Sequence, residues 1–524
     1  MNKNYFIFSL FLILSFNVFG QTAGMLDSTF NGTGRVQSNN IFHDIYNDVR
    51  IQSDQKIVAS GVSLNSSYTG CVVVDRWNTD GSADTSFGTN GRVQLFIGND
   101  SYAYDSYIRN DGKIIVAGIA YGHIGGFGVV LLQLNPNGSL DSTFGLNGVT
   151  IVDLTINDDL ASAMAVQSDG KILISGTYTD TLYRNVPMVL RFTEEGLIDS
   201  TFGINGRAEI AVTGTDNELT SISVMGDGRI VAAGHYETAF TFFDVLLIRL
   251  LPNGDLDSTF GTDGVVIQSL TAGIEESFGM QLAANGKIVI TGETTLPDFS
   301  FDVLLMQFDS TGSLDAGFGN NGAVTFNNGV NDIGLDLEIQ SDNKILICGT
   351  SGGSWLDDRD FLLMRYNQDG TPDYTFGDSG VVYTQIDSSF DEANAMALQE
   401  DGKIVLAGKA NDGATNLDFA ITRYYNDLYT VVQEYPLGQN ISLYPNPVEK
   451  SSALHLSLET NKIDRLFVEW FSIDGRLAGK NESITLSAGK NEIGLDVPQG
   501  IKKGVYFVRF SGTNLNFVQR VVVN

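Results

Sequence analysis

The stretch LDSTFGLNGVT, residues 140–150, is written seven times in this chain with small changes. Its copies begin at Leu26, Ala83, Leu140, Ile198, Leu256, Leu314 and Pro372. The phenylalanine of each copy lies 57 or 58 residues from the next, at positions 30, 87, 144, 202, 260, 318 and 376. Repetition with a period of this size predicts a solenoid, a propeller or another repeat array.

The third repeat shows what one unit contains. It reads AMAVQ, SDG, KILISGTY, VPMVLRF and then the DSTFGINGRAEI block, within residues 163–210. Short apolar and β-branched runs separated by Gly, Asn and Asp predict four strands, which we name A to D in chain order. No repeat contains ten residues with helical periodicity, so the pattern excludes a helical solenoid.

The LDSTFG block is therefore the connection between strands C and D. Its Asp, Ser and Thr can satisfy the turn backbone with their side chains. Its phenylalanine is the one large apolar group there, and we expect it to fill the gap between neighbouring sheets. A ligand-binding motif repeated seven times is the alternative, but a packing role explains every position of the block.

A basic residue follows the turn between strands A and B in every repeat. The seven are Lys56, Lys113, Lys171, Arg229, Lys287, Lys344 and Lys403. Asp-Gly or Asn-Gly precedes five of them and predicts a type I′ turn, whereas Asp54-Gln55 and Asp342-Asn343 predict a different one. We expect the basic side chains to pair with nearby acidic residues, for example in the DST segment. A ring that binds an anion is the alternative.

The order of the repeats predicts a closed ring. The first copy, LDSTFNGTGRVQ, precedes any strand A, B or C, and the last repeat ends after its strand C, DFAITRYYN (418–426). Residues 34–38 can supply the missing strand D of the last repeat, and such closure removes exposed sheet edges. We therefore predict an all-β protein, with a seven-bladed β-propeller of four strands per blade over residues 21–426.

The two ends of the chain differ from the repeats. Lys3 followed by the apolar run YFIFSLFLILSFNVFG predicts a secretory signal peptide over residues 1–20, and a membrane anchor is the alternative. No later segment is long and apolar enough to span a membrane. Residues 427–439 are a predicted linker. Residues 440–524 alternate apolar and polar positions between Asn-Pro, Asp-Gly and Lys-Gly breaks, which predicts a small C-terminal β-sandwich.

Two regions of the chain resemble known protein families. YPNP (444–447), SIDGR (472–476), KGVYFVRF (503–510) and the ending QRVVVN resemble the type A C-terminal sorting domain of the type IX secretion system. This resemblance implies export across both membranes by the type IX secretion machinery, and a protein that is secreted or displayed on the cell surface. A generic β-sandwich binding module is the alternative. Residues 26–426 resemble the delta-60 repeat family of β-propellers, which implies the fold and no particular activity.

Composition and the scarcity of catalytic motifs limit the function. The net charge is −31 with a pI near 4.3, which disfavours nucleic-acid binding. Cys71 and Cys348 cannot form a disulfide framework, and we expect both to be buried. The four histidines, at 43, 123, 235 and 455, are too scattered for a histidine metal site or a triad. No phosphate-binding loop or nucleophile elbow occurs.

A ring of acidic residues is the candidate site that remains. An acid stands twelve or thirteen positions before each basic turn residue, at Asp44, Asp100, Asp159, Asp216, Glu275, Asp332 and Asp391. These residues fall in the loops from strand D to strand A, at the mouth of the predicted channel. Such a ring could bind a metal ion, with calcium as the candidate, or a cationic group of a ligand. The alternative is that each carboxylate caps its own loop.

The sequence thus favours a binding protein over an enzyme. The variable B–C loops, such as TYTDTLYRNV (177–186), lie beside the channel mouth on a rigid scaffold, where binding commonly occurs. We predict a module for an extracellular glycan or protein ligand. A propeller hydrolase or lyase acting on glycans, and a structural surface-layer component, are the alternatives. Two carboxylates, or a carboxylate with His or Tyr, within hydrogen-bond reach would favour the enzyme.

Overall fold

The fold is known from a computed structural model of the chain, which divides into two compact units, Met1–Asp427 and Leu428–Asn524. The described residues are 23–38, 43–122, 125–212, 214, 216–238, 241–271, 273–295, 300–353, 358–387, 389–411, 416–426, 442–448, 453–460, 464–472, 477–498, 500–511 and 516–524. The predicted signal peptide and the predicted linker lie outside them. The described residues contain strands and turns but no helix, and hence none that is long and apolar enough to cross a membrane.

The first unit consists of seven four-stranded sheets, or blades. Strand A of blades one to seven is β2 (Asp44–Ile51), β6 (Asp100–Ile108), β10 (Asp159–Val166), β14 (Asn217–Val224), β18 (Glu275–Leu282), β22 (Asn331–Ile339) and β26 (Glu392–Leu398). Strand B is β3 (Ile57–Leu64), β7 (Ile114–Tyr121), β11 (Ile172–Thr179), β15 (Ile230–Thr238), β19 (Ile288–Thr295), β23 (Ile345–Gly352) and β27 (Ile404–Asn411). Strand C is β4 (Gly70–Trp77), β8 (Phe127–Leu134), β12 (Asn185–Phe192), β16 (Thr241–Leu250), β20 (Phe301–Phe308), β24 (Arg359–Tyr366) and β28 (Leu417–Tyr424). Strand D is β5 (Arg92–Leu95), β9 (Val149–Val152), β13 (Arg207–Glu209), β17 (Val265–Gln268), β21 (Ala323–Phe326), β25 (Val381–Thr384) and, from the N-terminal end, β1 (Arg35–Ser38).

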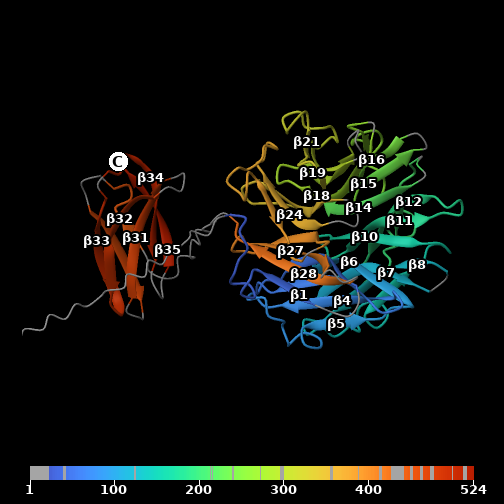
Figure 1. Cartoon of the computed structure of the whole chain (residues 1–524), viewed down its shortest axis with the longest axis horizontal. Coiled ribbons are helices and arrows are strands. Elements are labelled where there is room, and N and C mark those ends of the chain that lie inside the picture. The colour runs from blue at the N-terminus through green and yellow to red at the C-terminus, as the bar shows by residue number, and fades with distance from the viewer. Residues whose placement is uncertain are drawn as a thin grey trace, which may run out of the picture. The chain divides into compact units, whose positions relative to one another are not determined.

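Strand β1 closes the ring in the predicted way. It pairs antiparallel with β28, with Arg35 opposite Thr422 and Ser38 opposite Phe419. The sheet order of blade seven is therefore β1-β28-β27-β26, so residues from both ends of the repeat region share one blade (Figure 1). The predicted seven-bladed propeller with four strands per blade is confirmed.

The second unit is a β-sandwich. One sheet contains β29 (Ser442–Tyr444), β30 (Ala453–Thr460) and β33 (Gly489–Asp496). The other contains β32 (Leu477–Leu486), β31 (Asp464–Ser472), β34 (Gly504–Ser511) and β35 (Asn516–Val523). Leu456 and Leu458 of the first sheet share one buried core with Trp470 and Phe510 of the second. Both faces of this core come from alternating apolar positions, as the sequence predicts.

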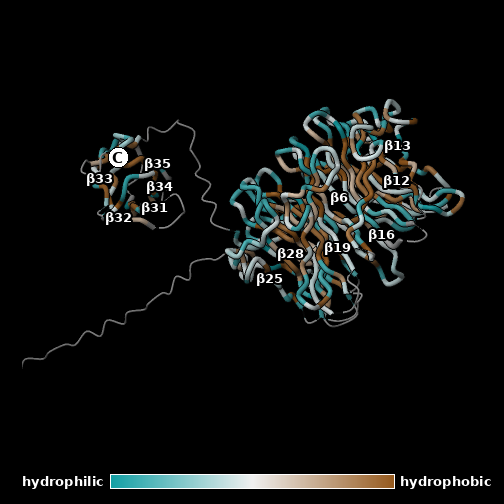
Figure 2. The backbone as a smooth tube through the Cα atoms, turned by 90° about the horizontal axis from the view of Figure 1, so that it is seen from above, coloured by the Kyte–Doolittle hydropathy of each residue, from teal (hydrophilic) through white to brown (hydrophobic). Residues whose placement is uncertain are grey.

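The propeller core lies between blades, with no single centre. Each interface buries the apolar residues of strands B and C of one blade against strands of the next. The strands are accordingly hydrophobic and the turns hydrophilic along the backbone (Figure 2). Because each blade uses both faces for packing, strand B reads as a nearly continuous apolar run.

The phenylalanine of the LDSTFG block fills the gap between blades, as predicted. All seven phenylalanines are buried, with no more than 1% of any of them exposed. Phe144 lies against Gly196 in the turn that follows strand C of the next blade, where an added Cβ would come within 2.4 Å of the ring. Gly196 has φ +79°, so this position suits glycine for its backbone as well as for its lack of a side chain.

A buried arginine fixes the same block from strand C in five blades. Arg249 donates to Asp257 of its own block and to the carbonyl oxygen of Ser310 in the next blade. Its guanidinium carbon lies 4.5 Å from the centre of the Phe260 ring. The equivalent arginines are Arg76, Arg191, Arg365 and Arg423, each stacked on the phenylalanine of its own block. In blades two and five a glutamine, Gln133 or Gln307, occupies this position.

The basic residue after the A–B turn pairs with the same aspartate, as predicted. Lys171 lies 3.1 Å from Asp199, and Lys344 lies 2.7 Å from Asp373. The pattern holds in all seven blades, with Lys403 and Asp27 closing the ring at 3.8 Å. The basic residues therefore stabilise the C–D connections of their own blades.

The prediction of a type I′ turn between strands A and B is wrong. In the turn of blade two, Gly112 has φ +81° while Asp111 does not have positive φ. Gly112 donates to the carbonyl oxygen of Arg109, so the turn is a three-residue loop with one left-handed residue. Gln55 and Asn343 take this position in the two repeats without glycine, at φ 67° and 66°. All seven repeats therefore use the same kind of turn.

Candidate functional site

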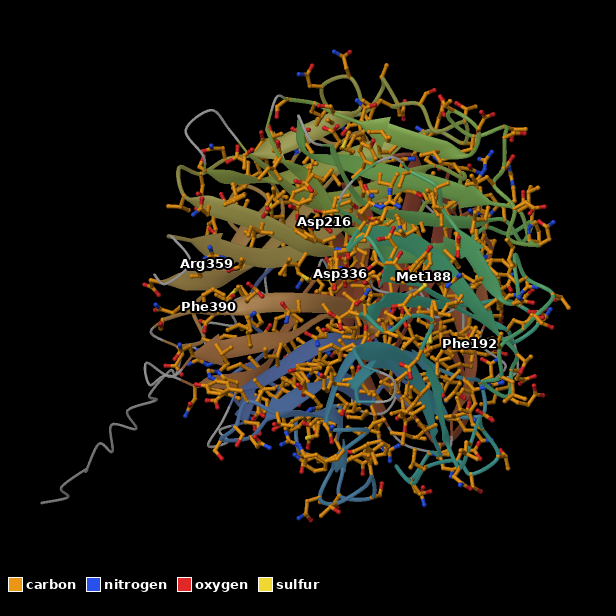
Figure 3. The ribbon with its side chains drawn as sticks, turned by 90° about the vertical axis from the view of Figure 1, so that its right-hand side faces the viewer. Met188, Phe192, Asp216, Asp336, Arg359 and Phe390 are labelled. Carbon is orange, nitrogen blue, oxygen red and sulfur yellow. The ribbon has the colours of Figure 1, made fainter. Side chains whose placement is uncertain are left out.

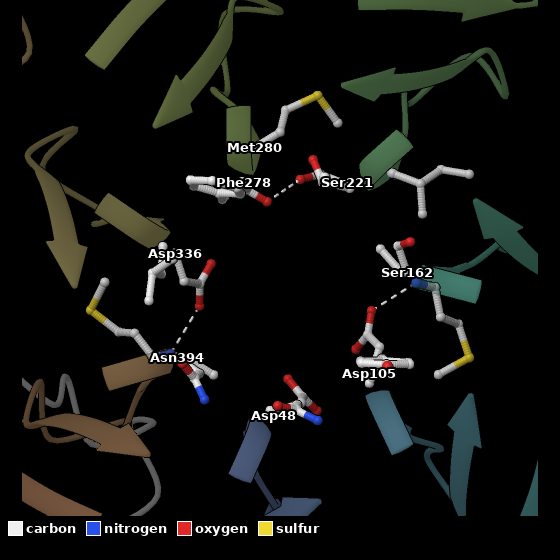
Figure 4. A pocket seen from close by; sticks show the side chains of 18 of the residues that line it. Asp48, Asp105, Ser162, Ser221, Phe278, Met280, Asp336 and Asn394 are labelled. Atoms are coloured by element: carbon white, nitrogen blue, oxygen red, sulfur yellow. Dashed lines mark hydrogen bonds between the residues drawn. The ribbon is translucent and has the colours of Figure 1, made fainter. Parts of the chain in front are cut away.

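The inner strands surround a polar cavity of about 240 Å³. Each strand A carries one extra residue, a β-bulge, where it lines this cavity. The bulged residues are Asn47, Tyr104, Ser162, Thr220, Phe278, Leu335 and Asn394. Labelled residues of the lining point toward one central space (Figure 4). A bulge turns a side chain out of the regular alternation, so the backbone itself directs one residue per blade into the channel.

Several bulged residues link one blade to the next. The Asn47 amide donates to the carbonyl oxygen of Ala103, and the Asn394 amide donates to that of Tyr46, each over 2.7 Å. The hydroxyl of Thr220 donates to the carbonyl oxygen of Ser277 over 2.7 Å. These contacts satisfy backbone groups at the free edge of strand A, which faces the channel.

Three aspartates directly after the bulges continue this network. Asp48 accepts from the N–H of Ser106, Asp105 from that of Met164, and Asp336 from that of Met396, all in the following blade. Arg50 donates to Asp105 over 2.6 Å and lies 3.1 Å from Asp48. The aspartates therefore have a structural task in the channel, and only Arg50 forms ion pairs with them among the described residues.

Burial leaves this acidic channel partly protonated near neutral pH. Burial raises the pKa of Asp48 to about 7, although the Arg50 charge opposes the rise. Burial also raises the pKa of Asp336 to about 6 and that of Glu338 to about 7. A cavity with this lining can hold protons or attract a cation, because its carboxylates outnumber its one arginine.

Five members of the predicted acidic ring are buried, and four of these five cap their own loops. Asp44, Asp159, Glu275, Asp332 and Asp391 are all 0% exposed. Asp159 accepts from the N–H groups of Leu154 and Thr155. Glu275 accepts from the corresponding groups of Leu270 and Thr271, and Asp391 from those of Ile386 and Asp387. Burial raises the pKa of Asp332 and of Asp391 to about 6.

Two members of the predicted ring occupy a different position. In the other five blades the acid stands three residues before the bulge of strand A. In blades two and four the strand register places Ser101 and Asn217 at this position, and Asp100 and Asp216 stand one residue earlier. Asp100 instead accepts from the N–H of Gly70, and Asp216 from the amide of Asn185, both in the preceding blade. Ser101 accepts from the N–H of Ile97, so a serine can perform the capping task of the acids.

The structure does not gather the ring into one site. Within the residues that it describes, no three His, Cys, Asp or Glu side chains are arranged to hold a metal ion. The capping contacts give four of the seven acids a role in loop structure, which the sequence offered as the alternative. Calcium binding at these residues stays a prediction.

Sequence reasoning missed the channel residues, although a signal for them existed. Asp48 and Asp336 stand four residues after a ring acid, and Asp105 stands five residues after one. Regular alternation would place residues four apart on the same face of a strand. The intervening bulge changes that parity, so the sequence shows the recurring acids but not the direction in which their side chains point.

Two tyrosines meet a carboxylate within hydrogen-bond reach: Tyr102 donates to the partly buried Asp100 over 3.2 Å, and Tyr46 meets a buried one. The Tyr46 hydroxyl donates to Asp75 over 2.5 Å, and Arg92 donates to the same carboxylate. Tyr46 is 0% exposed and stacks on Phe419 at 4.1 Å between blades one and seven. Burial, together with the Asp75 charge, raises the pKa of Tyr46 well above its usual range. This group is sealed in a blade interface, so it stabilises the ring closure and offers no access to a substrate.

The opposite situation holds on the outer loops, where tyrosines are exposed. Tyr68 is 69% exposed in the B–C loop of blade one, and Tyr183 is 82% exposed in that of blade three. Phe96, in a D–A loop, is 72% exposed. In antiparallel blades the B–C and D–A loops share one face of the propeller, so these rings surround the same channel mouth.

Comparison with known proteins assigns both regions. Residues 52–87, 109–144, 167–202, 226–260, 283–318, 340–376 and 399–427 match the family described as Domain of unknown function (DUF5122) beta-propeller. Residues 442–524 match the Secretion system C-terminal sorting domain. No curated protein matches the chain.

Solved structures resemble the chain only distantly. PorZ, a surface component of the type IX secretion system of Porphyromonas gingivalis, is 12% identical with a TM-score of 0.38, covering 93% of this chain. This chain spans 61% of the length of PorZ. An ulvan lyase of polysaccharide lyase family PL25 is 11% identical with a TM-score of 0.41, covering 75% of this chain and 96% of the lyase. Scores this low support no statement about activity.

The seven propeller matches fall on the seven blades in order, and the sorting-domain match covers the strands of the second unit. The sorting domain indicates export to the cell surface or secretion, and implies handling by the type IX secretion machinery. The protein therefore belongs to the DUF5122 β-propeller family and carries a type IX secretion C-terminal sorting domain.

Proposed function

We propose that this exported propeller is a binding module, which takes a glycan or protein ligand on the face that carries the B–C and D–A loops. The observation that carries the proposal is the pair of exposed tyrosines in blades one and three. Tyr68 and Tyr183 both have φ 58°, in the left-handed region that bulky residues rarely adopt. Neither gains burial in return for this backbone conformation.

The two turns present their tyrosines in the same way. Asn65 accepts from the N–H groups of Ser67 and Thr69, and the carbonyl oxygen of Asn65 accepts from Tyr68. Asp180 makes the equivalent bonds in blade three, from Leu182, Arg184 and Tyr183. Glycine or asparagine would fit this position with less strain. A strained and exposed aromatic residue, repeated in two blades, supports contact with a ligand.

Other exposed rings extend this surface. Tyr121 is 42% exposed at the end of β7, and Tyr383 is 44% exposed in β25, near the D–A loop. His43 stacks on Tyr68 with ring centroids 5.7 Å apart, which holds that ring in place. Aromatic rings with polar tips suit both sugar faces and protein surfaces, since one side chain offers apolar area together with a hydrogen bond.

The test is a glycan and protein binding array probed with the exported chain, with and without calcium. The Tyr68→Asn/Tyr183→Asn double variant keeps a residue type that tolerates positive φ, so the turns should survive. We expect this variant to lose the ligands that the parent binds. Tyr374→Asn is the matched control, because Tyr374 is 72% exposed in the C–D connection on the opposite face. Equal binding by the parent and the double variant would refute this role of the tyrosines.

Export has its own test in the native host. A chain truncated at Tyr435 lacks the sorting domain but keeps every propeller strand. We expect it to remain in the periplasm, because the type IX machinery acts on the C-terminal domain. Immunodetection on intact cells measures the difference, and normal surface display of the truncated chain would contradict the assignment.

A further inference from the structure

Two carboxyl groups lie side by side in blade five, where β18 and β19 reach the face that carries the B–C and D–A loops, which we call the loop face. Glu276 and Glu293 are directly opposite each other in the antiparallel pair, so their side chains share one face of the sheet. Val289 and Thr291 precede Glu293 on this face, and Val289 packs against blade six. Cross-strand positions hold their Cβ atoms about 4.5–5.5 Å apart.

Neither carboxyl group has a partner in the part of the chain that the structure describes. Glu293 is only 8% exposed, yet it receives no hydrogen bond and forms no ion pair with a described residue. Glu276 is partly exposed and is equally without such a partner. His235, 8% exposed on the neighbouring blade, leaves its Nδ1 without a hydrogen bond to any described residue. Buried polar groups in proteins are nearly always satisfied, so a carboxyl group as buried as Glu293 that no described residue contacts by a hydrogen bond calls for an explanation.

Blade seven shows one way in which an acid at the same position is satisfied. Glu392 occupies the place in β26 that Glu276 occupies in β18, two residues before the bulge. Opposite Glu392 stands Lys409, whose Nζ lies 2.7 Å from the carboxylate. In blade five the residue opposite is a second carboxyl group. The ammonium group that blade seven supplies from its own chain is therefore missing in blade five.

Charged groups from both neighbouring blades face this pair. From blade four, His235 attracts the Glu276 carboxylate, whereas Glu218 and Asp216 repel it. From blade six, Arg359 attracts Glu293 but forms no ion pair with it, and its guanidinium carbon lies 5.4 Å from the centre of the Phe390 ring. Arg359 and Phe390 are labelled next to each other in Figure 3. Burial raises the pKa of Glu293 to about 8, and the Glu276 charge adds to the rise.

We propose that Glu276 and Glu293 bind the ammonium group of a lysine side chain from a protein partner. This inference rests on the proposed binding function and names the chemistry of its ligand. Glu276 is the partly exposed carboxylate of the pair, and Glu293 is the buried one. An ammonium group has three N–H donors, which is enough to serve both carboxylates.

The geometry favours a lysine over an amino sugar. Only 8% of Glu293 is exposed, so the cation must arrive on a thin stem, and lysine has an unbranched chain of four methylenes. The amino group of a sugar is attached directly to a ring, so it has no such stem. The net charge of −31 also attracts a basic protein partner over long range.

Binding should release a proton. Below about pH 8 Glu293 holds a proton on its carboxyl group, and the arriving ammonium group replaces that proton, which passes to the buffer. The buried site then contains a carboxylate and an ammonium group where it had a neutral acid. Proton release at pH 7 is a signature that attraction by exposed surface carboxylates does not produce.

The experiment is isothermal titration calorimetry of the exported chain with a short lysine peptide. The comparison probes are the same peptide with norleucine, which keeps the stem but lacks the charge, and a glucosamine oligomer. We expect the lysine peptide to bind and the norleucine peptide not to bind. Glu276→Gln and Glu293→Gln should each weaken binding by roughly tenfold. Titrations at pH 7 in buffers of different ionisation enthalpy should show release of about one proton by the parent and none by Glu293→Gln.

Glu392→Gln is the matched control, because its carboxylate occupies the same strand position but already has Lys409, and its binding should equal that of the parent. Equal binding of lysine and norleucine peptides, or unchanged affinity in both blade-five variants, would overturn the proposal. Binding of the glucosamine oligomer alone would overturn the choice of a protein partner. An array ligand that needs Tyr68 and Tyr183 but ignores Glu276 and Glu293 would leave the binding function in place and reject this site.

Discussion

The two faces of the propeller are built by opposite rules. On the face of the C–D connections, every blade repeats one set of contacts, in which a buried phenylalanine, an aspartate and a basic turn residue meet. On the loop face, equivalent positions differ from blade to blade, as Glu392 with Lys409 differs from Glu276 with Glu293. Repeated contacts hold the blades together, and varied contacts leave groups exposed or unsatisfied. Function is therefore expected on the varied face.

The difference can also be stated in charges. On the face of the C–D connections, which we call the repeated face, the Asp199 carboxyl group accepts from Thr201 and lies beside Lys171 and Arg191. Burial alone would raise the pKa of Asp199, but these contacts outweigh it and hold the pKa well below the usual range. In the channel and at its mouth, burial dominates and raises the pKa of Glu338 to about 7 and that of Glu293 to about 8. Paired acids stabilise the fold at neutral pH, whereas unpaired acids destabilise it there.

The largest effect is expected from breaking the repeated face where the ring closes. Deleting residues 26–38 removes β1, Asp27 and Phe30 together. Blade seven would then expose the edge of β28 and leave Arg423 buried without its carboxylate. We expect loss of cooperative unfolding or aggregation, measured by calorimetry and light scattering. A variant that melts like the parent would contradict closure by β1.

The next effect concerns a single arginine of the same face. Arg249→Ala leaves Asp257 and the Ser310 carbonyl oxygen without their buried donor, and should destabilise the propeller by about 3–5 kcal/mol. Arg249→Gln should cost only about 1–2 kcal/mol, because Gln133 donates to Asp141 at this place in blade two. Thermal unfolding of both variants measures the difference. Equal losses would show that a neutral donor cannot replace the charged guanidinium at this position.

A smaller effect, of opposite sign, is expected in the channel. Burial places the folded-state pKa of Glu338 at about 7, against 4.5 for the free side chain. The favourable contribution of Glu338 to the free energy of unfolding is therefore present below pH 4.5 and is lost as the pH rises through 7. Glu338→Gln should therefore stabilise the protein by about 1–3 kcal/mol at pH 8, and by almost nothing at pH 4.5.

Melting temperatures between pH 4.5 and pH 8 test this prediction. Glu400→Gln, at an exposed position in an A–B turn, is the control and should not change the pH dependence. A Glu338→Gln variant that follows the parent at every pH would show that the carboxyl group is hydrated in the folded state.

The smallest effect is expected from calcium on the loop face. If the acidic ring binds calcium, millimolar calcium should raise the melting temperature of the parent, since the ion would bind only the folded state. The capping contacts of Asp159 and Glu275 instead lead us to expect no response. Asp159→Asn, Glu275→Gln and Asp332→Asn combined should then lower the melting temperature equally with and without calcium. A calcium-dependent rise that this triple variant abolishes would establish the metal site.

The sequence by itself determined the blade count, the strand order and the closure by residues 34–38. It could do so because the packing of the LDSTFG block is local and is repeated at a fixed spacing, so seven copies report the same contacts. Phe30 stands almost 400 residues before Arg423, which stacks on its ring in the folded chain. The copy of the block that contains Phe30 could still be recognised from its own sequence.

Only the tertiary structure decided which polar residues are free and which are engaged. Asp159 and Glu293 are both buried acids at the loop face, but one caps its own loop and the other has no partner among the described residues. Bulges in strand A change which side chains enter the channel, and register decides that Ser101 rather than Asp100 joins the buried ring. These outcomes depend on the positions of neighbouring blades and not on local spacing, because a side chain's partners across a blade interface lie about 57 residues away in the chain.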